Sequence, residues 1–244
     1  MHHPRPAEEA SSAAVQTLAL RARAGRLVIY VGAGVSAAEP AALPVGPALA
    51  ERASEWLEGR IAGLGSYDDK NLMDLADAVE QQEGGRELLQ EALIELAEFG
   101  EADVNYAHRA LALLLTEGAV HVLTTNWDDC IERGTPVGTR LQVIVNDGDF
   151  ASIRGPAVLK VHGCVSRRGS LLVSTTDLAR PPLWVTTGLA PHLAMSTIVF
   201  LGIGDIAAYI KVRLRQLLEL AGLTADLRVV SPGIVSGWEN SAPR

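Results

Sequence analysis

The sequence predicts an α/β fold: a Rossmann-like parallel sheet with helices on both faces and a helical insertion. Four apolar runs, at residues 27–31, 120–123, 158–161 and 198–201, each lead directly into a polar or glycine-rich turn. Helical spacing of apolar residues fills most of the chain between the first two runs. Hydrophobic residues make up 48% of the chain and aromatic residues only 5%, so the core is mainly aliphatic. Such a core is typical of parallel strands that are buried on both faces.

The N-terminal part predicts a helix, a strand and a second helix. Apolar residues with helical spacing occupy residues 11–24, and Gly25 ends this helix before the strand at 27–31. The segment 39–46 is rich in Ala and Pro, and we expect it to be a mobile lid. Pro47 then suits the first turn of the next helix, where a missing N–H has no cost.

The region that follows predicts helices without a strand. Two apolar faces with helical spacing lie between residues 68 and 115, and they are separated by the pair Gly84-Gly85. A helix over 104–115 leads back to the sheet. We therefore expect a helical insertion at about residues 60–117.

The second half predicts strands and helices that complete the same sheet. The expected elements are, in order, a short helix ending near Gly134, strands at 141–145 and 158–161, a short strand at 171–173, a strand at 198–201, an amphipathic helix at 206–220 and a strand at 227–230. Residues 1–232 are expected to form one domain, and residues 233–244 a tail or linker.

Charge and cysteine usage exclude several classes of function. The 21 basic and 29 acidic side chains give a net charge of −8, which argues against a surface that follows the nucleic-acid backbone. Cys130 and Cys164 are far apart, so neither a four-thiolate zinc site nor a disulfide framework can be built. We therefore expect no metal, and a reducing, cytoplasmic location.

The sequence predicts neither a signal peptide nor a membrane span. Charged and polar residues precede any apolar run at the start of the chain. The most membrane-like window, residues 192–210, is interrupted by Gly202, Gly204 and Asp205, and it fits a strand, a turn and a helix better.

The turn after the first strand has the composition of a phosphate-binding turn. Gly32, Ala33 and Gly34 lack bulky side chains, so backbone N–H groups can approach a diphosphate, and Ser36 can add a hydroxyl or cap the next helix. The pattern G-x-G is weak by itself. A tight turn between a strand and a helix, without a ligand, explains it equally well.

Polar residues also follow the later strands. The amide of Asn126 can both donate to and accept from a ribose hydroxyl or a water, and Asp128 is either a functional carboxylate or a helix cap. His162 is a candidate general base, because its ordinary pKa suits neutral pH. Lys160, inside a buried strand, needs a partner, and an acidic ligand is one candidate. We interpret His108 and His121 as structural.

The order of the four motifs GAGVS, TTNWD, KVHG and FLGIGD resembles the SIR2-like family over residues 27–230. Sirtuins carry GAGxS, T-x-N-x-D, HG and a final glycine turn in that order. The resemblance implies that NAD binds at these motifs. It implies the cofactor-binding residues Gly32, Ala33, Gly34, Ser36, Thr125, Gly202 and Asp205, and the catalytic residues Asn126, His162 and Asp128.

Departures from sirtuin deacylases indicate a narrower resemblance. The zinc ribbon of four cysteines is missing, and Leu43-Pro44 is not followed by the Phe and Arg of the deacylase motif. Gly204 stands where the last turn has a serine. The helical insertion, TTN-aromatic-D and KVHG resemble the bacterial SIR2-like NAD hydrolases of antiphage defence.

This narrower resemblance implies an NAD+ hydrolase that cleaves the nicotinamide–ribose bond and depletes NAD, without a metal. It also implies a homo-oligomer, a partner defence protein or a fused module, and no contact with nucleic acid or membrane. Two alternatives remain open: a catalytically silent module that senses NAD or ADP-ribose, and a deacylase or ADP-ribosyltransferase.

Overall fold

The computed structural model describes residues 6–189, 193, 195–203 and 226–230 of the 244-residue chain. Three of the sequence-based expectations lie outside the described residues: the helix at 206–220, the tail at 233–244 and the turn residues Gly204 and Asp205.

The centre of the fold is a six-stranded sheet with the strand order β3-β4-β2-β1-β5-β6, in which every neighbouring pair is parallel. The strands are β1 (Leu27–Val31), β2 (His121–Thr124), β3 (Gln142–Ile144), β4 (Ala157–Lys160), β5 (Thr197–Leu201) and β6 (Asp226–Val230). Val31, at the end of β1, is in register with Thr124 of β2 and Leu201 of β5. The carboxyl ends of the central strands therefore meet at one edge, and the expected Rossmann-like sheet is confirmed.

Both faces of the sheet are covered, as the uninterrupted apolar strands predict. Leu27, Ile29 and Val31 of β1 pack toward Leu111, Ala112 and Leu115 of α6 (Tyr106–Thr116). The alternate residues of β1 belong to a second core on the other face, with Trp184 and Val185 of a π-helix (Trp184–Gly188). Each fully buried aliphatic side chain contributes about 1.5–3 kcal/mol, so this double coverage is a major part of the fold's stability.

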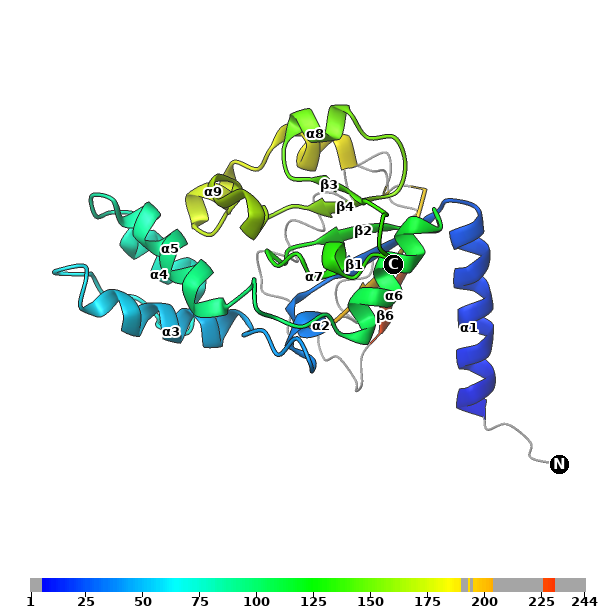
Figure 1. The fold of residues 1–244 in the computed structure, drawn as a ribbon, viewed down its shortest axis with the longest axis horizontal. Coiled ribbons are helices and arrows are strands. Elements are labelled where there is room, and N and C mark those ends of the chain that lie inside the picture. The colour runs from blue at the N-terminus through cyan, green and yellow to red at the C-terminus, as the bar shows by residue number, and fades with distance from the viewer. Residues whose placement is uncertain (1–5, 190–192, 194, 204–225, 231–244) are drawn as a thin grey trace.

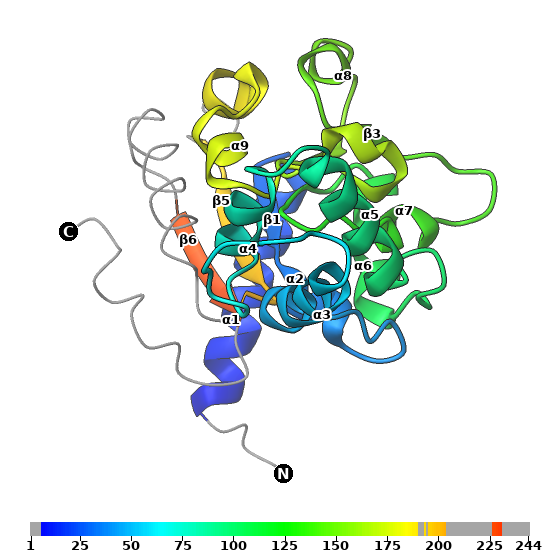
Figure 2. The ribbon, with the colours of Figure 1, turned by 90° about the vertical axis from the view of Figure 1, so that its left-hand side faces the viewer.

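A layer of three helices extends from one end of the sheet, and α1 (Pro6–Arg23) lies at the other end (Figure 1). The layer consists of α3 (Gly46–Glu58), α4 (Leu72–Val79) and α5 (Gly85–Ala97), which share an apolar core. Figure 2 shows the three helices in front of the sheet. Residues 32–120 are all described and contain helices but no strand, as the periodicity predicts. The layer begins at Gly46, whereas the insertion was expected to begin at about residue 60. Helix α6 lies within the expected insertion, but it packs on the sheet and is not part of the layer.

Four short helices connect the remaining strands: α2 (Ala33–Ala37), α7 (Cys130–Arg133), α8 (Asp147–Ala151) and α9 (Thr175–Ala179). A 3-10 helix (Val165–Ser170) lies between β4 and α9. The prediction of a strand at 171–173 is wrong. Leu171 and Val173 are buried, but Ser174 caps α9 directly after them, with Asp177 as the second member of a capping box. The segment therefore forms a loop that buries apolar side chains without pairing in the sheet.

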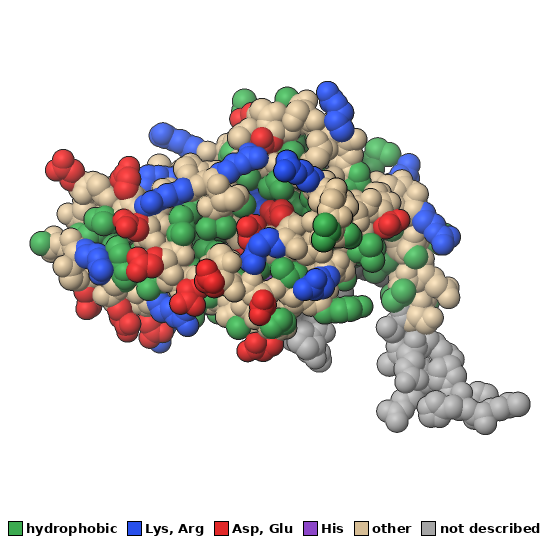
Figure 3. All heavy atoms as spheres, viewed as in Figure 1, with side chains coloured by type: hydrophobic (Ala, Val, Ile, Leu, Met, Phe, Trp, Pro, Cys, Tyr) green, Lys and Arg blue, Asp and Glu red, His purple; other side chains and the backbone are tan. Residues whose placement is uncertain are grey.

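The surface carries both signs of charge. Figure 3 shows acidic and basic side chains intermixed on the face that it presents, with acidic ones frequent over the helical layer. Among the described residues, no helix has the length and hydropathy needed to cross a membrane.

Candidate active site

A cavity of about 510 Å³ opens at the carboxyl ends of the central strands. Its volume lies within the range of about 300–1,000 Å³ that small-molecule sites have. The turns after β1, β2, β4 and β5 supply the polar part of its lining, which includes Gly32, Ala33, Gly34, Ser36, Thr125, Asn126, Asp128, His162 and Gly202. The structure thus brings together every candidate residue that it describes. Asp205 lies outside the described residues.

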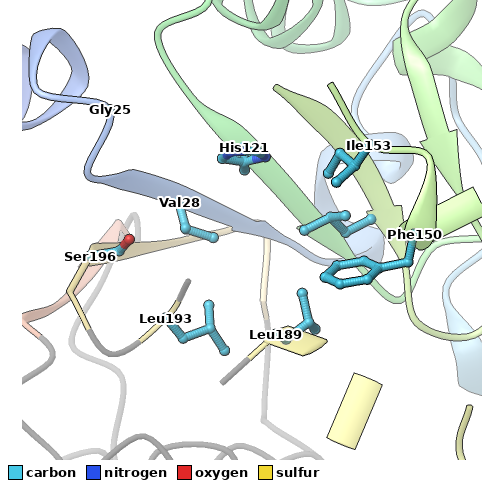
Figure 4. A pocket seen from close by; sticks show the side chains of 9 residues that line it. Gly25, Val28, His121, Phe150, Ile153, Leu189, Leu193 and Ser196 are labelled. Atoms are coloured by element: carbon cyan, nitrogen blue, oxygen red, sulfur yellow. The ribbon is translucent and has the colours of Figure 1, made fainter. Parts of the chain in front are cut away.

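The opposite edge of the sheet has a much smaller cavity, of about 40 Å³. Figure 4 shows its lining near the amino ends of the strands, with Val28, His121 and Ser196 among the side chains around it. His121 is therefore remote from the candidate site, in keeping with its separation from the motifs.

The glycines of the first turn are required by contact with the last turn. A Cβ on Gly34 would lie 2.7 Å from the carbonyl oxygen of Gly202, and a Cβ on Gly32 would lie 2.8 Å from the same atom. Gly202 itself has φ +65°, and a Cβ there would lie 2.5 Å from the backbone nitrogen of Val35. The two turns can approach so closely only without side chains.

This contact also uses N–H groups that were expected to face a diphosphate. The N–H of Gly32 donates to Leu201 O at 3.0 Å, and that of Gly34 donates to Gly202 O at 2.8 Å. The N–H of Val35 donates to Gly32 O. Of the N–H groups of Gly32, Ala33 and Gly34, all in the described part of the chain, that of Ala33 has no backbone acceptor and is open to a ligand.

The hydroxyl of Ser36 joins the first turn to the second. Its Oγ donates to Asp128 Oδ2 at 2.9 Å, accepts from Asn126 Nδ2 at 3.2 Å and lies 3.1 Å from His108 Nε2. Ser36 is only 3% exposed. The sequence suggested a direct contact of this hydroxyl with a ligand or a helix cap, whereas the structure uses it to hold the polar side chains together.

Asp128 accepts two hydrogen bonds within the protein, and it is not the N-cap of α7, because that position belongs to Asp129. Oδ1 accepts from the N–H of Cys130 at 3.1 Å, at the start of α7, while Oδ2 accepts from Ser36. The carboxylate is 5% exposed. A buried carboxylate needs hydrogen-bond partners, and these two bonds supply them.

His108 has a larger part in the site than the sequence suggested. Asn105 is the N-cap of α6: its Oδ1 accepts from the N–H of His108, and its own N–H donates to His108 Nδ1 at 3.3 Å. The other ring nitrogen reaches Ser36. Burial lowers the pKa of His108, and this outweighs the opposite effect of Asp128. The spacing Asn-x-x-His at the start of a helix is the signal that could have indicated this arrangement.

Lys160 finds its partner within the protein. Its Nζ lies 3.2 Å from Glu132 Oε1 in α7, and it also donates to the carbonyl oxygen of Asp128. Burial lowers the pKa of Lys160, but the Glu132 carboxylate, with Cys164 and Asp128, outweighs burial and raises it. Lys160 therefore supports the backbone under the candidate site from inside the core.

The backbone of His162 is held by two donors. Trp127 Nε1 and the N–H of Leu172 each donate to His162 O at 3.0 Å. The next residue, Gly163, has φ +88°, and a Cβ there would lie 2.0 Å from Ser170 O. His162 is half-buried and lines the large cavity.

A second cavity, of about 410 Å³, adjoins the first beside His162 and Trp127. It extends toward α4 and α9, past Asn71 and Leu178. The two cavities share five lining residues, so His162 has access to both.

The expected lid at residues 39–46 lines the large cavity through Leu43, Pro44, Val45 and Gly46. Its low content of side chains suggested weak anchoring. The structure shows an anchor in its middle: Leu43 is buried in the core of the helical layer, and its N–H donates to Ser36 O at 2.9 Å.

Three potential metal ligands lie close together below the cavity: the donor atoms of His108, Asp128 and Cys130 are within 4.8 Å of one another. The donor set fits a metal poorly. The ring nitrogens of His108 contact Asn105 N–H and Ser36 Oγ, and Asp128 accepts from Ser36. Burial, together with the charge of Asp128, raises the pKa of the Cys130 thiol to about 12, whereas a metal-bound cysteine is a thiolate.

Comparison with known proteins identifies the class of fold. Residues 120–230 match the family model of the SIR2-like domain. A crystal structure of a Sir2 homologue in complex with NAD has 18% identity and a TM-score of 0.51, and the match covers 97% of this chain and 87% of that chain. A structure from a study of the mechanism and regulation of Sir2 enzymes has 14% identity and the same TM-score, with 92% and 87% covered. None of the curated proteins compared matches the chain. The chain thus has the Sir2 fold, and its resemblance to the SIR2-like family is confirmed.

Proposed function

We propose that this protein is an NAD+ hydrolase that cleaves the bond between nicotinamide and ribose. The observation that carries the proposal is the meeting of the GAGVS turn, Asn126, Asp128 and His162 around one cavity of the Sir2 fold. A Sir2 homologue of the same fold was solved with NAD, which supports NAD as the ligand here.

The chemistry needs little more than positioning. Nicotinamide leaves a cationic nucleotide as a neutral molecule, so its departure needs no strong acid. The protein has to orient the ribose and support positive charge on the sugar while a nucleophile attacks. Water is the nucleophile in hydrolysis.

Asn126 and His162 have complementary roles in this proposal. Asn126 Nδ2 donates to Gly32 O and Ser36 Oγ, which leaves the acceptor Oδ1 for a ribose hydroxyl or the attacking water. His162 takes a proton from the water or from a ribose hydroxyl, as a general base. The apolar part of the lining, including Leu49, Leu72 and Phe99, suits the flat nicotinamide ring.

The biological role we propose is NAD depletion in antiphage defence, in the cytoplasm, together with further copies of the chain or with a partner or fused module. The motif pattern TTN-aromatic-D and KVHG and the lack of cysteines for a zinc ribbon support this subtype over a deacylase. We further propose that residues 1–232 act as one NAD-cleaving domain, with residues 233–244 as a tail or linker.

One observation favours a second candidate function, the transfer of ADP-ribose. The cavity of about 410 Å³ beside His162 provides space for an acceptor other than water.

Chromatography of NAD incubated with the purified protein separates hydrolysis, transfer and binding without turnover. Hydrolysis predicts nicotinamide and ADP-ribose, or a cyclic form of it, without any acceptor. Release that requires an added acceptor would favour transfer, and tight binding of NAD without turnover, with or without candidate partners, would favour a sensor.

A further inference from the structure

The hydrogen bonds around Ser36 determine where the protons of the site lie. Asp128 Oδ2 is an acceptor, so the single proton of the Ser36 hydroxyl points to it. Ser36 Oγ must then accept from its other two neighbours, Asn126 Nδ2 and His108 Nε2. His108 therefore carries a proton on Nε2.

The cap of α6 leads to the same assignment from the other side of the ring. The N–H of Asn105 points at His108 Nδ1, which has to be a bare acceptor. A neutral ring with its proton on Nε2 satisfies both contacts. The lowered pKa of the buried ring agrees with a neutral His108.

The same network orients the amide of Asn126. Gly32 O and Ser36 Oγ are both acceptors toward this amide, so both of its protons are directed into the protein. If the Ser36 proton turned toward Asn126, the amide could satisfy Gly32 and Ser36 only by breaking one of these bonds. The Asp128 carboxylate holds the Ser36 proton away from Asn126, and the donor on His108 Nε2 occupies one of the two acceptor positions of Ser36 Oγ, so the hydroxyl keeps a single orientation and leaves its other acceptor position to Asn126.

We propose that His108 is a positioning residue of this site: by donating to Ser36 it keeps the Asn126 amide oxygen, an acceptor, facing the cavity. The inference rests on the proposed function for its catalytic consequence. The group that this amide oxygen would bind is a hydroxyl that donates a hydrogen bond, either a sugar hydroxyl or water. His108 acts through Ser36 and Asn126 and does not touch the substrate.

Two substitutions of His108 separate positioning from capping. His108→Gln places an amide N–H at the end of the side chain, where it can still donate to Ser36, but it loses the acceptor for Asn105. His108→Asn keeps an acceptor near the position of Nδ1, but its side chain is too short to reach Ser36. Both remove a ring from the same buried place, so the cost in packing is similar.

The expected result is a crossover between activity and stability. His108→Asn should lower kcat for NAD cleavage about 10- to 100-fold, the usual effect of misplacing a reacting group, with a KM near that of the wild type. His108→Gln should keep kcat within about threefold while its Tm falls further than that of His108→Asn. Ser36→Ala should lower kcat as His108→Asn does, and the double variant should lose no more. Loss of kcat in proportion to loss of Tm in both variants would overturn the proposal.

A measurement that needs no turnover keeps this test separate from the test of the proposed function. Long-range ¹H–¹⁵N NMR of the wild-type protein should show His108 with its proton on Nε2, and the side-chain amide signals of Asn126 should shift more in His108→Asn than in His108→Gln. A proton on Nδ1, or equal shifts in both variants, would overturn the inference. If the wild type does not cleave NAD but gives the expected spectra, the proposed function fails and the positioning of Asn126 stands.

Discussion

The Ser36 hydroxyl and the Asp128 carboxylate lie 2.9 Å apart, although 92 positions separate them in the chain. Ser36 belongs to the turn after β1 and Asp128 to the turn after β2, and these strands are neighbours in the sheet. The bond is buried, and together with the bond from Asn126 Nδ2 to Gly32 O it fixes the relative position of the two motifs. Asn126 and His108 complete the network.

The amide group of Asn126 should be essential for turnover, and its oxygen alone should not suffice. Asn126→Asp keeps the size and the acceptors but has no N–H for Gly32 O and Ser36 Oγ. We expect NAD cleavage to fall about 100-fold or more, because the group that faces the ribose loses its support. Initial rates by chromatography measure this effect. Asn146→Asp is the matched control, because Asn146 uses only its oxygen to cap α8 and should keep the wild-type rate. Equal rates for all three proteins would refute the role of Asn126.

Gly34→Ala should destabilise the fold by about 1–3 kcal/mol, the usual cost of overpacking, because the new Cβ would lie 2.7 Å from Gly202 O. Chemical denaturation measures the free energy of unfolding. Gly59→Ala is the control: no atom lies within 4 Å of a Cβ there, and its φ of −84° suits alanine. If Gly34→Ala were as stable as this control, the two turns would not be in close contact.

The stability of the protein should decrease as the pH falls from about 6.5, the ordinary pKa of histidine, through the lowered pKa of folded His108. Between these two values the unfolded chain binds more protons than the folded chain, so the free energy of unfolding rises with pH. Besides burial, Asp128, Arg133 and Lys160 act on this ring: the first raises its pKa and the other two lower it. Tm measured against pH should be flatter in His108→Gln than in the wild type. Parallel curves would assign the pH dependence to other groups.

We predict that the purified protein contains no stoichiometric metal and that chelators change neither its Tm nor its activity. The donor atoms of His108 and Asp128 are engaged in hydrogen bonds, and the high pKa of Cys130 keeps its thiol protonated. A metal would have to break these hydrogen bonds and remove the thiol proton. Elemental analysis and thermal unfolding with and without chelator test this directly. Bound zinc that is lost in Cys130→Ser would show that these residues form a metal site.

The sequence was most informative where local patterns and the sheet agree. The strand at Leu27–Val31 was predicted with its observed bounds, because five consecutive apolar residues between Gly25 and Gly32 leave little choice of where the strand begins and ends. The apolar residues 171–173 were misread as a strand, since a buried loop and a short strand have the same composition. The capping box of Ser174 and Asp177, three residues apart, is the local signal that a helix begins directly after this apolar run.

The residues of the candidate site could be predicted from the sequence, but the contacts that join them could not. Parallel strands bring the ends of motifs to one edge, so Asn126 and His162 could be assigned to the same cavity from their positions alone. His108 could not, because it enters from helix α6 and reaches the site only through Ser36. The close contact between Gly34 and Gly202 likewise depends on the pairing of β1 with β5, which the sequence does not reveal.

The most direct test of the account is the rate of nicotinamide release from NAD by three purified proteins: the wild type, His162→Ala and His121→Ala. His162 lines the large cavity, whereas His121 lines the small cavity at the opposite edge of the sheet. The account predicts that His162→Ala loses about 10²–10⁴-fold in rate, the contribution of a general base, while it stays folded and binds NAD, and that His121→Ala keeps the wild-type rate per folded molecule. A folded His162→Ala that releases nicotinamide as fast as the wild type would contradict the account.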